Sequence, residues 1–502
     1  MTEPTAAQTP SSGRLPLVLA AVVCLAIVAV VVALVARGDD DGFTALYGKQ
    51  SEALNRRWER PPDPPDWTLV DGDAASSYRA AWAEQDKSRT LSSDPASNAF
   101  NLVAPDHRPG PALTVPEAGP VPSSCAALGI GADTDPALRF LDEQSCAAMA
   151  GKGPLLLAEG TYRKDSSSPA RVWDTWGIAR PGDTPNFVPF LRLAKLHALL
   201  GWTAHLRGDT DRLVTAVHEL HRFGQDIGRG SSLLGAMVGT AIDLQAARML
   251  RRMLRDRLLT GPQAALLHRQ YAYADAERLR LEDVFAGEFL VMLPALMDED
   301  QRERVDIPPT AILDAGLQSP GVLAWYWRES FAALHFAFWQ DILSDTPATW
   351  AARDARYMRW EQEFDSSINP LAQIGGGFLA QYDLKLTMAQ AHDRMLQIAL
   401  ADYAYTAEHG EPAGTLETLS EAGFAIPVDP LTQAPFELTA TEGKRQLHST
   451  CPPVPRMSAW TDDEALLTLE LTGPPPPAPA EAVPNAEAPE VDSAAPEKEP
   501  AP

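Results

Sequence analysis

Residues 188–293 carry the apolar periodicity that most constrains this fold. Within Phe190–Arg207 the apolar side chains recur three or four positions apart, and the same spacing returns over 210–228. Such spacing places side chains on one face of a helix. The sequence therefore predicts amphipathic helices, whose apolar faces are built from Leu193, Leu196, Leu199, Leu200 and Leu206, then Leu213, Val217, Leu220 and Phe223.

Helix stop and start signals divide this stretch. Gly208 can close one helix and Asp209 or Thr210 can cap the next. Gly228 and Gly230 end the second helix, and Ser231 or Ser232 caps a third that runs to about Leu259. Thr260-Gly261-Pro262 starts a fourth, which runs to about Leu293. Short links force antiparallel neighbours, so the fold class is mainly α: stacked antiparallel αα-hairpins, solenoid-like or bundled.

The third of these helices carries Gly235 and Gly239, four residues apart. In a membrane this spacing favours helix dimerisation. Here the run is short and Asp243 follows it, so we expect instead a close approach of two helices in a soluble core.

Three more helices are expected beyond residue 293. Pro320–Ser344 is aromatic on nearly every face, which indicates burial on several sides, with a binding groove as the alternative. Thr349–Asp365 and Phe378–Glu408 follow.

The C-terminal part changes period. Residues 435–441 and 444–449 alternate about Glu442-Gly443, which predicts a β-hairpin, and 465–471 offers a further strand. From 473 the chain is rich in Pro, Ala and Glu, with no apolar face to bury, and is expected to be a disordered acidic tail.

Near the N-terminus, Leu15–Ala36 is an uncharged run of mostly Val, Leu and Ala. At ~1.5 Å per residue, a helix over this run spans the ~30 Å core of a bilayer. A cleaved signal peptide is the alternative, but its apolar region is normally ~7–15 residues long. Arg14 and Arg37 flank the run, so charge says little about orientation. We place the short leader in the cytoplasm and the bulk of the chain in the periplasm.

These patterns give a provisional division of the chain. Its parts are a disordered cytoplasmic leader (1–14), a transmembrane helix (15–36), a juxtamembrane and loop-rich region (37–187), a helical domain (188–410), a small β-hairpin module (411–472) and a disordered tail (473–502).

Charge and cysteine placement bear on partners and compartment. The chain has 67 acidic and 42 basic residues, a formal net charge of −25. Nucleic-acid binding needs a positive surface, so no nucleic-acid partner is expected. Cys125 and Cys146 are close in sequence and would form a disulfide in an oxidising compartment, with unpaired buried thiols as the alternative.

Residues 405–449 carry a resemblance. The segment from Tyr405 through Glu408-His409-Gly410-Glu411-Pro412, then Pro427–Phe436 and a hairpin ending in His448-Ser449, resembles a module of uncharacterised exported bacterial proteins of planctomycete and myxobacterial type. Those proteins have one N-terminal anchor and a helical body. The turn before the hairpin is also similar to the C-terminal part of type II secretion pseudopilins. The pseudopilin cleavage motif does not precede Leu15–Ala36. The resemblance implies topology and no catalytic residue.

The clearest candidate for chemistry is His218-Glu219-Leu220-His221. Two imidazoles three apart can share a helix face, but zinc needs a third protein ligand. His197 and His205 on the preceding helix are the histidines able to come near, and a polar seam between helices is the alternative. No nucleophile elbow or phosphate loop occurs, so we assign no catalytic residue and no cofactor.

The leading functional hypothesis is a non-enzymatic, membrane-anchored envelope protein that presents a protein-interaction or scaffold surface to another envelope protein. One alternative is an envelope hydrolase that uses the histidine-bearing face of 188–226. Clustering of His197, His205, His218 and His221 around one cavity would favour the hydrolase, and scattering would favour the scaffold. A second alternative is a secretion-apparatus component related to pseudopilins.

Overall fold

The described part of the chain is mainly helical and ends in a small antiparallel sheet. The structure is a computed structural model. It describes residues 45–46, 48–50, 74–87, 153–163, 187–228, 233–276, 278, 280–297, 334–344, 346–367, 378–441, 444–452 and 467–474.

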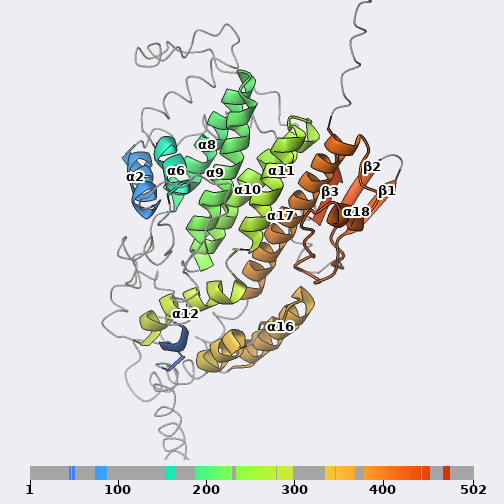
Figure 1. Ribbon diagram of the computed structural model, residues 1–502. Helices are drawn as coiled ribbons and strands as arrows, with labels where there is room; N and C mark the ends of the chain where they lie inside the picture. The colour runs from blue at the N-terminus through green and yellow to red at the C-terminus, as the bar shows by residue number, and fades with distance from the viewer. Residues whose placement is uncertain are drawn as a thin grey trace, which may run out of the picture.

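Five long helices lie side by side with nearly parallel axes (Figure 1). The chain runs up and down through the first four, and the last returns from far along the sequence to pack against two of them. This arrangement confirms the predicted mainly α class with packed helix pairs. The helices are α8 (Val188–Leu206), α9 (Thr210–Gly228), α10 (Leu233–Arg255), α11 (Gly261–Ala276) and α17 (Phe378–His409).

The predicted glycine stop and side-chain caps are present at the end of α8 and at the starts of α9 and α11. Gly208 has φ +91°, a conformation that closes α8 without a side-chain penalty. The Asp209 carboxylate accepts a hydrogen bond of 3.0 Å from the Arg212 amide and so caps α9. Thr260 and Gln263 form a reciprocal capping box at the start of α11.

The prediction of one fourth helix to about Leu293 is wrong. The structure has α11, a break, and then α12 (Leu281–Met297), which lies across the lower end of the long helices (Figure 1). Neither Gly nor Pro occurs between Ala276 and Leu281. The break instead places Arg278 among buried carboxylates, a tertiary cause that periodicity does not reveal.

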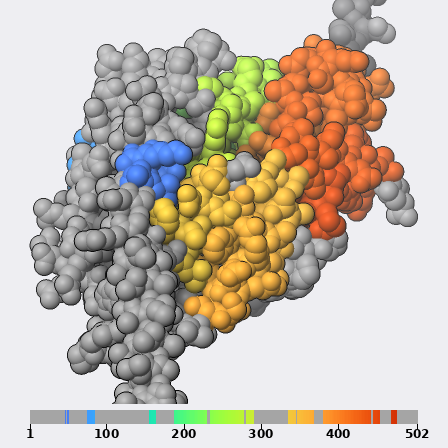
Figure 2. Space-filling model, turned by 90° about the horizontal axis from the view of Figure 1, so that it is seen from below, coloured from blue at the N-terminus to red at the C-terminus, as the bar shows by residue number. Residues whose placement is uncertain are grey.

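A second, aromatic-rich core lies below the long helices, between α12, α16 (Trp350–Ser366) and the start of α17. Residues 334–344 are helical, and Phe338 and Trp339 within them are buried. This agrees with core packing for the described end of the predicted helix 320–344. Figure 2 views the molecule from below, where α16 covers much of the surface beside the C-terminal part.

One buried ion pair fixes α16 to α17. The Arg353 guanidinium donates to both oxygens of Asp383, at 2.7 and 3.1 Å. Tyr357 and Thr387 also donate to Asp383, at 2.8 and 2.9 Å. All the hydrogen-bonding capacity of this carboxylate is used within the protein, so the pair is structural.

Two helices come from the region expected to be loop-rich. They are α2 (Ala74–Lys87) and α6 (Gly153–Thr161), which pack against each other and against α8. Tyr78 of α2 is fully buried and donates a hydrogen bond of 2.8 Å to Asp226 on α9. Residues from 37–187 therefore contribute to the main core.

The predicted hairpin is confirmed, with a third strand. β1 (Glu437–Thr441) pairs with β2 (Lys444–His448), and β2 pairs with β3 (Thr468–Leu471), both antiparallel. A short helix, α18 (Leu416–Glu421), precedes the sheet. Phe436, Leu447 and Leu469 belong to the main core, so the sheet and the long helices share one apolar interior.

The Asp-Pro turn before the hairpin is held by one carboxylate. Asp429 is fully buried and accepts from the Leu431 amide at 2.9 Å and from the Ser449 hydroxyl at 2.6 Å. It also accepts from the Thr450 amide at 3.2 Å. The turn is thereby tied to the end of β2, which gives this motif a structural role.

Several predictions lie outside the described residues and stay predictions: the leader 1–14, the span Leu15–Ala36, the predicted tail 473–502 beyond residue 474, and the Cys125–Cys146 bridge. Among the described helices, α10 alone is long and apolar enough to cross a membrane. Of its most apolar stretch, 67% is buried within the protein. A core helix satisfies the same criterion, so α10 is only weak evidence for a membrane span.

Candidate functional site

The candidate site begins where α9 and α10 pack most closely. A Cβ on Gly239 would lie 2.6 Å from the backbone nitrogen of Gly228, and one on Gly224 would lie 2.7 Å from the carbonyl oxygen of Gly239. Contacts this short are possible only for glycine. The predicted close helix approach at Gly239 is thus confirmed, and it brings polar side chains on the two helices into contact.

His221 and Asp243 meet one turn away from these glycines. His221 Nδ1 is hydrogen-bonded to Asp243 Oδ1, and both side chains are buried. The side-chain amide of Gln225 lies 3.4 Å from the other ring nitrogen, Nε2. Donation from Nδ1 to the carboxylate and acceptance at Nε2 is the tautomer that satisfies both contacts.

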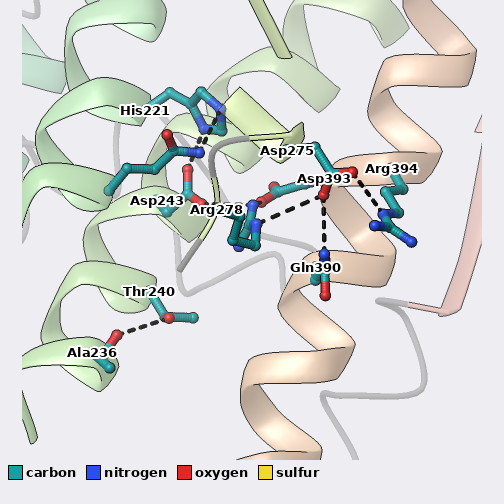
Figure 3. Close-up of polar contacts among 10 residues, drawn as sticks. His221, Ala236, Thr240, Asp243, Asp275, Arg278, Gln390, Asp393 and Arg394 are labelled. Atoms are coloured by element: carbon teal, nitrogen blue, oxygen red, sulfur yellow. Dashed lines mark hydrogen bonds and ion pairs between the residues drawn. The ribbon is translucent and has the colours of Figure 1, made fainter. Parts of the chain in front are cut away.

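Arg278 joins this pair to α17. Its Nη2 lies 3.3 Å from Asp243 Oδ2 and also forms an ion pair with Asp393 of α17. Figure 3 shows Arg278 between Asp243 on one side and Asp393 on the other. One guanidinium from the α11–α12 link therefore connects α10 and α17.

A second layer of contacts surrounds the arginine. Asp275 at the end of α11 lies 3.8 Å from Arg278 Nε. It also accepts from Gln390 at 3.1 Å and from Arg394 at 2.9 Å, both on α17 (Figure 3). These contacts fix the position of the link that carries Arg278.

Tyr271 of α11 completes the cluster. Its ring stacks on the His221 imidazole, with centroids 4.0 Å apart and planes 8° apart. Burial, followed by the negative charges of Asp393 and Asp243, raises the pKa of the Tyr271 hydroxyl well above its ordinary value. Among the described residues, this buried hydroxyl has no hydrogen-bond partner.

The two carboxyl groups of the cluster differ in their affinity for protons. Burial favours the neutral form of Asp243, but the charge and hydrogen bond of His221, together with Arg278, lower its pKa to about 2. Burial and the neighbouring Asp243 charge raise the pKa of Asp393 well above its ordinary value, against the effect of Arg278. The two groups therefore ionise in widely separated pH ranges.

A cavity of about 80 Å³ opens beside Asp243 and Arg278. One water occupies about 30 Å³ in the liquid, whereas pockets for organic ligands are typically ~300–1,000 Å³. The cavity therefore suits a few waters or a hydrated ion. Its wall combines polar and apolar side chains, among them Gln225, Thr240, Leu281, Val284, Leu386, Thr387 and Gln390.

The histidines singled out by the sequence do not converge. His197 is buried against Glu219 at 2.5 Å, and Arg212 binds the same carboxylate at 2.7 Å. His205 is bonded to Thr210 at 2.9 Å, near the link between α8 and α9. They occupy contacts separate from that of His221.

His218 also lies apart from His221, although the sequence pairs the two as metal candidates. Its ring packs 6.2 Å from that of Tyr162, beyond the end of α6. Burial, then the charge of His221, lowers the pKa of His218 to about 4. Of the two candidates, only His221 belongs to the cluster.

Sequence reasoning missed Tyr271, Arg278 and Asp393 as site residues, and it treated Asp243 only as a charge that argues against a membrane helix. Each of these residues lies on a different segment, so no local spacing links them. The available signal was a charged residue inside an apolar helix, at Asp243 and Asp393, since such residues are buried only when paired.

Comparison of the chain with protein-family models, with curated proteins and with solved structures gives no match in any of the three.

Proposed function

We propose that this chain is a membrane-tethered envelope protein whose helical body is a non-enzymatic protein-interaction or scaffold module. Leu15–Ala36 is the tether, the short leader lies in the cytoplasm, and the body lies in the periplasm. The partner is another envelope protein, and nucleic acid is not a partner because the net charge is −25.

The observation that supports this proposal is that buried polar side chains pair with one another between elements of the fold. His197 bonds to Glu219, Arg353 to Asp383 and Arg445 to Asp402, each pair joining two elements of the fold. The four histidines that a hydrolase would bring to one cavity are spread over separate contacts. Polar residues paired with one another between helices stabilise a rigid shape, which suits a scaffold.

The packing of α8, α9 and α10 into successive antiparallel pairs favours the solenoid-like form of this proposal. Stacked helix pairs present extended surfaces along their length. The internal contacts of α10 explain its apolar length without a membrane, so in this proposal the tether is Leu15–Ala36.

In-cell crosslinking tests the scaffold function. A photo-reactive residue is placed at exposed positions on α16, Ala355 or Met358, in the full chain, and at buried Phe364 as a matched control. We expect one repeatable crosslinked band from the exposed positions that disappears when residues 15–36 are deleted. No repeatable band, or the same bands from Phe364, would contradict the proposal.

One observation favours a second candidate, an envelope hydrolase. Asp243 and Asp393 are paired carboxyl groups with pKa values pushed apart, and Asp243 lines a cavity. Such pairs serve as acid and base in enzymes. Hydrolysis of nitrophenyl esters or phosphates by the purified chain, abolished in Asp393→Asn, would support it. Equal rates for the chain and the variant would remove it.

A third proposal is a secretion-apparatus component related to pseudopilins. It rests on the Asp429 turn and the hairpin that the turn holds. Co-isolation of the chain with a secretion complex is the test, and purification of that complex without the chain would count against it.

A further inference from the structure

We propose that His221, Asp243 and Asp393 form a binding site for a divalent transition metal, best suited to zinc, with water from the adjacent cavity as the remaining ligand. The three side chains come from α9, α10 and α17, and all are buried. A site of this kind would join α9 and α10 to α17 through one ion.

The donor set and its spacing fit such an ion. One ligand atom from each of the three residues lies within 4.8 Å of the others. Zinc binds imidazole nitrogen and carboxylate oxygen at ~2.0–2.2 Å, so two ligands of one ion lie roughly 3.5 Å apart. Small side-chain rotations would bring the three atoms to that separation. One nitrogen and two oxygens are a donor set that zinc, manganese or iron(II) accepts.

Unsatisfied polar atoms provide a second, independent observation. Asp393 is 4% exposed, and its Oδ1 has no hydrogen-bond partner among the described residues. The buried hydroxyl of Tyr271 is likewise without a partner there. A buried acceptor left unpaired is destabilising. A cation at Asp393 satisfies the oxygen, and a metal-bound water satisfies the hydroxyl.

The contacts of His221 are those of a metal-ligating histidine. With Nδ1 on the ion, the proton moves to Nε2, which lies 3.4 Å from the Gln225 amide nitrogen, so a flip of that amide would present its oxygen as the acceptor. Ligating imidazoles normally donate their second N–H in this way, which fixes the ring. Stacking on Tyr271 holds the same ring plane.

Arg278 must give up part of its present role when the metal binds. It now contacts both carboxyl groups with a single positive charge, and a divalent ion would take its place there with two. Asp275 is the alternative partner, since its Oδ1 lies 3.8 Å from Arg278 Nε, and this Nε has no hydrogen bond among the described residues. We therefore assign Arg278 to Asp275 in the metal-bound form.

The cavity completes the site. It is lined by Asp243 and Arg278 and holds about 80 Å³, enough for one or two metal-bound waters. His218 is excluded as the third protein ligand because it packs against Tyr162 at a different contact.

The test is metal binding by the full chain, purified in detergent through a tag that lacks histidine and stripped with a chelator. Zinc chloride is added, unbound metal is removed by dialysis, and bound zinc is measured by mass spectrometry. We expect about one zinc per chain. His221→Asn and Asp393→Asn should each weaken zinc binding at least tenfold in calorimetric titration. Glu408→Gln and His409→Asn, exposed changes on α17, should bind as the unaltered chain does.

A measurement on the unaltered chain covers the case in which a variant fails to fold. Cobalt(II) added to the stripped chain should give the visible bands of a four- or five-coordinate ion with nitrogen and oxygen ligands. A sulfur-to-metal absorption band would place the metal at a cysteine, either Cys451 or one of the three outside the described residues, and would overturn the proposal. Substoichiometric zinc, or equal binding by the chain and a folded His221→Asn variant, would overturn it as well.

Discussion

The ring of Tyr271 lies flat on the imidazole of His221, 4.0 Å between centroids, and so connects α11 to the contact between α9 and α10. Stacking fixes the plane of the imidazole, and rotation of the ring out of this plane would break the hydrogen bond between His221 and Asp243. The ring, more than its hydroxyl, is therefore what Tyr271 contributes to the fold.

This relationship predicts different results for two substitutions of one residue. Tyr271→Phe keeps the stacked ring and removes a buried hydroxyl without a described partner, so the free energy of unfolding should change by less than ~1 kcal/mol. Tyr271→Leu loses the stacking and leaves space, and should destabilise by about 2–4 kcal/mol. Urea unfolding measures both. Equal losses would show that the hydroxyl, not the ring, is important.

The close contact of α9 and α10 predicts that Gly239→Ala is destabilising. The added methyl group would meet backbone atoms of Gly228, which cannot move aside as a side chain can. We expect a loss of roughly 1–3 kcal/mol or more in the free energy of unfolding.

Gly414→Ala is the matched control, because a Cβ at Gly414 has nothing within 4 Å. That substitution should be neutral or stabilising by up to ~1 kcal/mol. A fully stable Gly239→Ala protein would contradict the close contact of α9 and α10.

The ion pair between Arg353 and Asp383 predicts a large loss from removing one partner. Arg353→Leu would leave the fully buried Asp383 carboxylate without its cation, and we expect about 3–5 kcal/mol of destabilisation. Arg359→Leu, which removes a half-exposed arginine paired with Asp341, should cost less than ~1 kcal/mol. Thermal unfolding of both variants checks the difference, and similar losses would contradict the structural role of the buried pair.

His335 predicts a loss of stability in acid. Burial among Phe338 and Phe364 lowers the pKa of His335 from 6.5 to about 4. His335 therefore binds a proton near pH 6.5 in the unfolded chain but only near pH 4 in the folded chain. The free energy of unfolding is therefore unaffected by His335 above pH 6.5 and decreases as the pH falls, by roughly 3 kcal/mol at pH 4.

His335→Phe removes the titrating group, so its unfolding midpoint should fall less between pH 7 and pH 5 than that of the unaltered chain. An identical fall in both proteins would show that His335 is not the cause.

The sequence predicts those features that have local causes. Gly208 and Asp209 separate α8 from α9 through their own backbone and side-chain chemistry, and Thr260 caps α11 in the same way. Alternation over 435–449 predicts β1 and β2, because a hairpin is a contact between neighbours. These elements need no knowledge of the rest of the chain.

Features with distant causes were not predictable in this way. The end of α11 depends on Arg278 reaching Asp393, which is 115 residues away in sequence. His221 was noticed for its spacing from His218, yet its partner is Asp243, on the next helix. α2 and α6 went unpredicted because their core contacts, such as Tyr78 with Asp226, are supplied by α9.

The position of the helical body relative to the membrane tests the central claim most directly. Alkaline phosphatase, active only outside the cytoplasm, and green fluorescent protein, fluorescent only inside it, are each fused to Pro502 of the full chain and of a chain lacking residues 15–36. We predict an active phosphatase and a dark fluorescent protein for the full chain, with both results reversed by the deletion. A fluorescent full-length fusion with an inactive phosphatase would contradict the account.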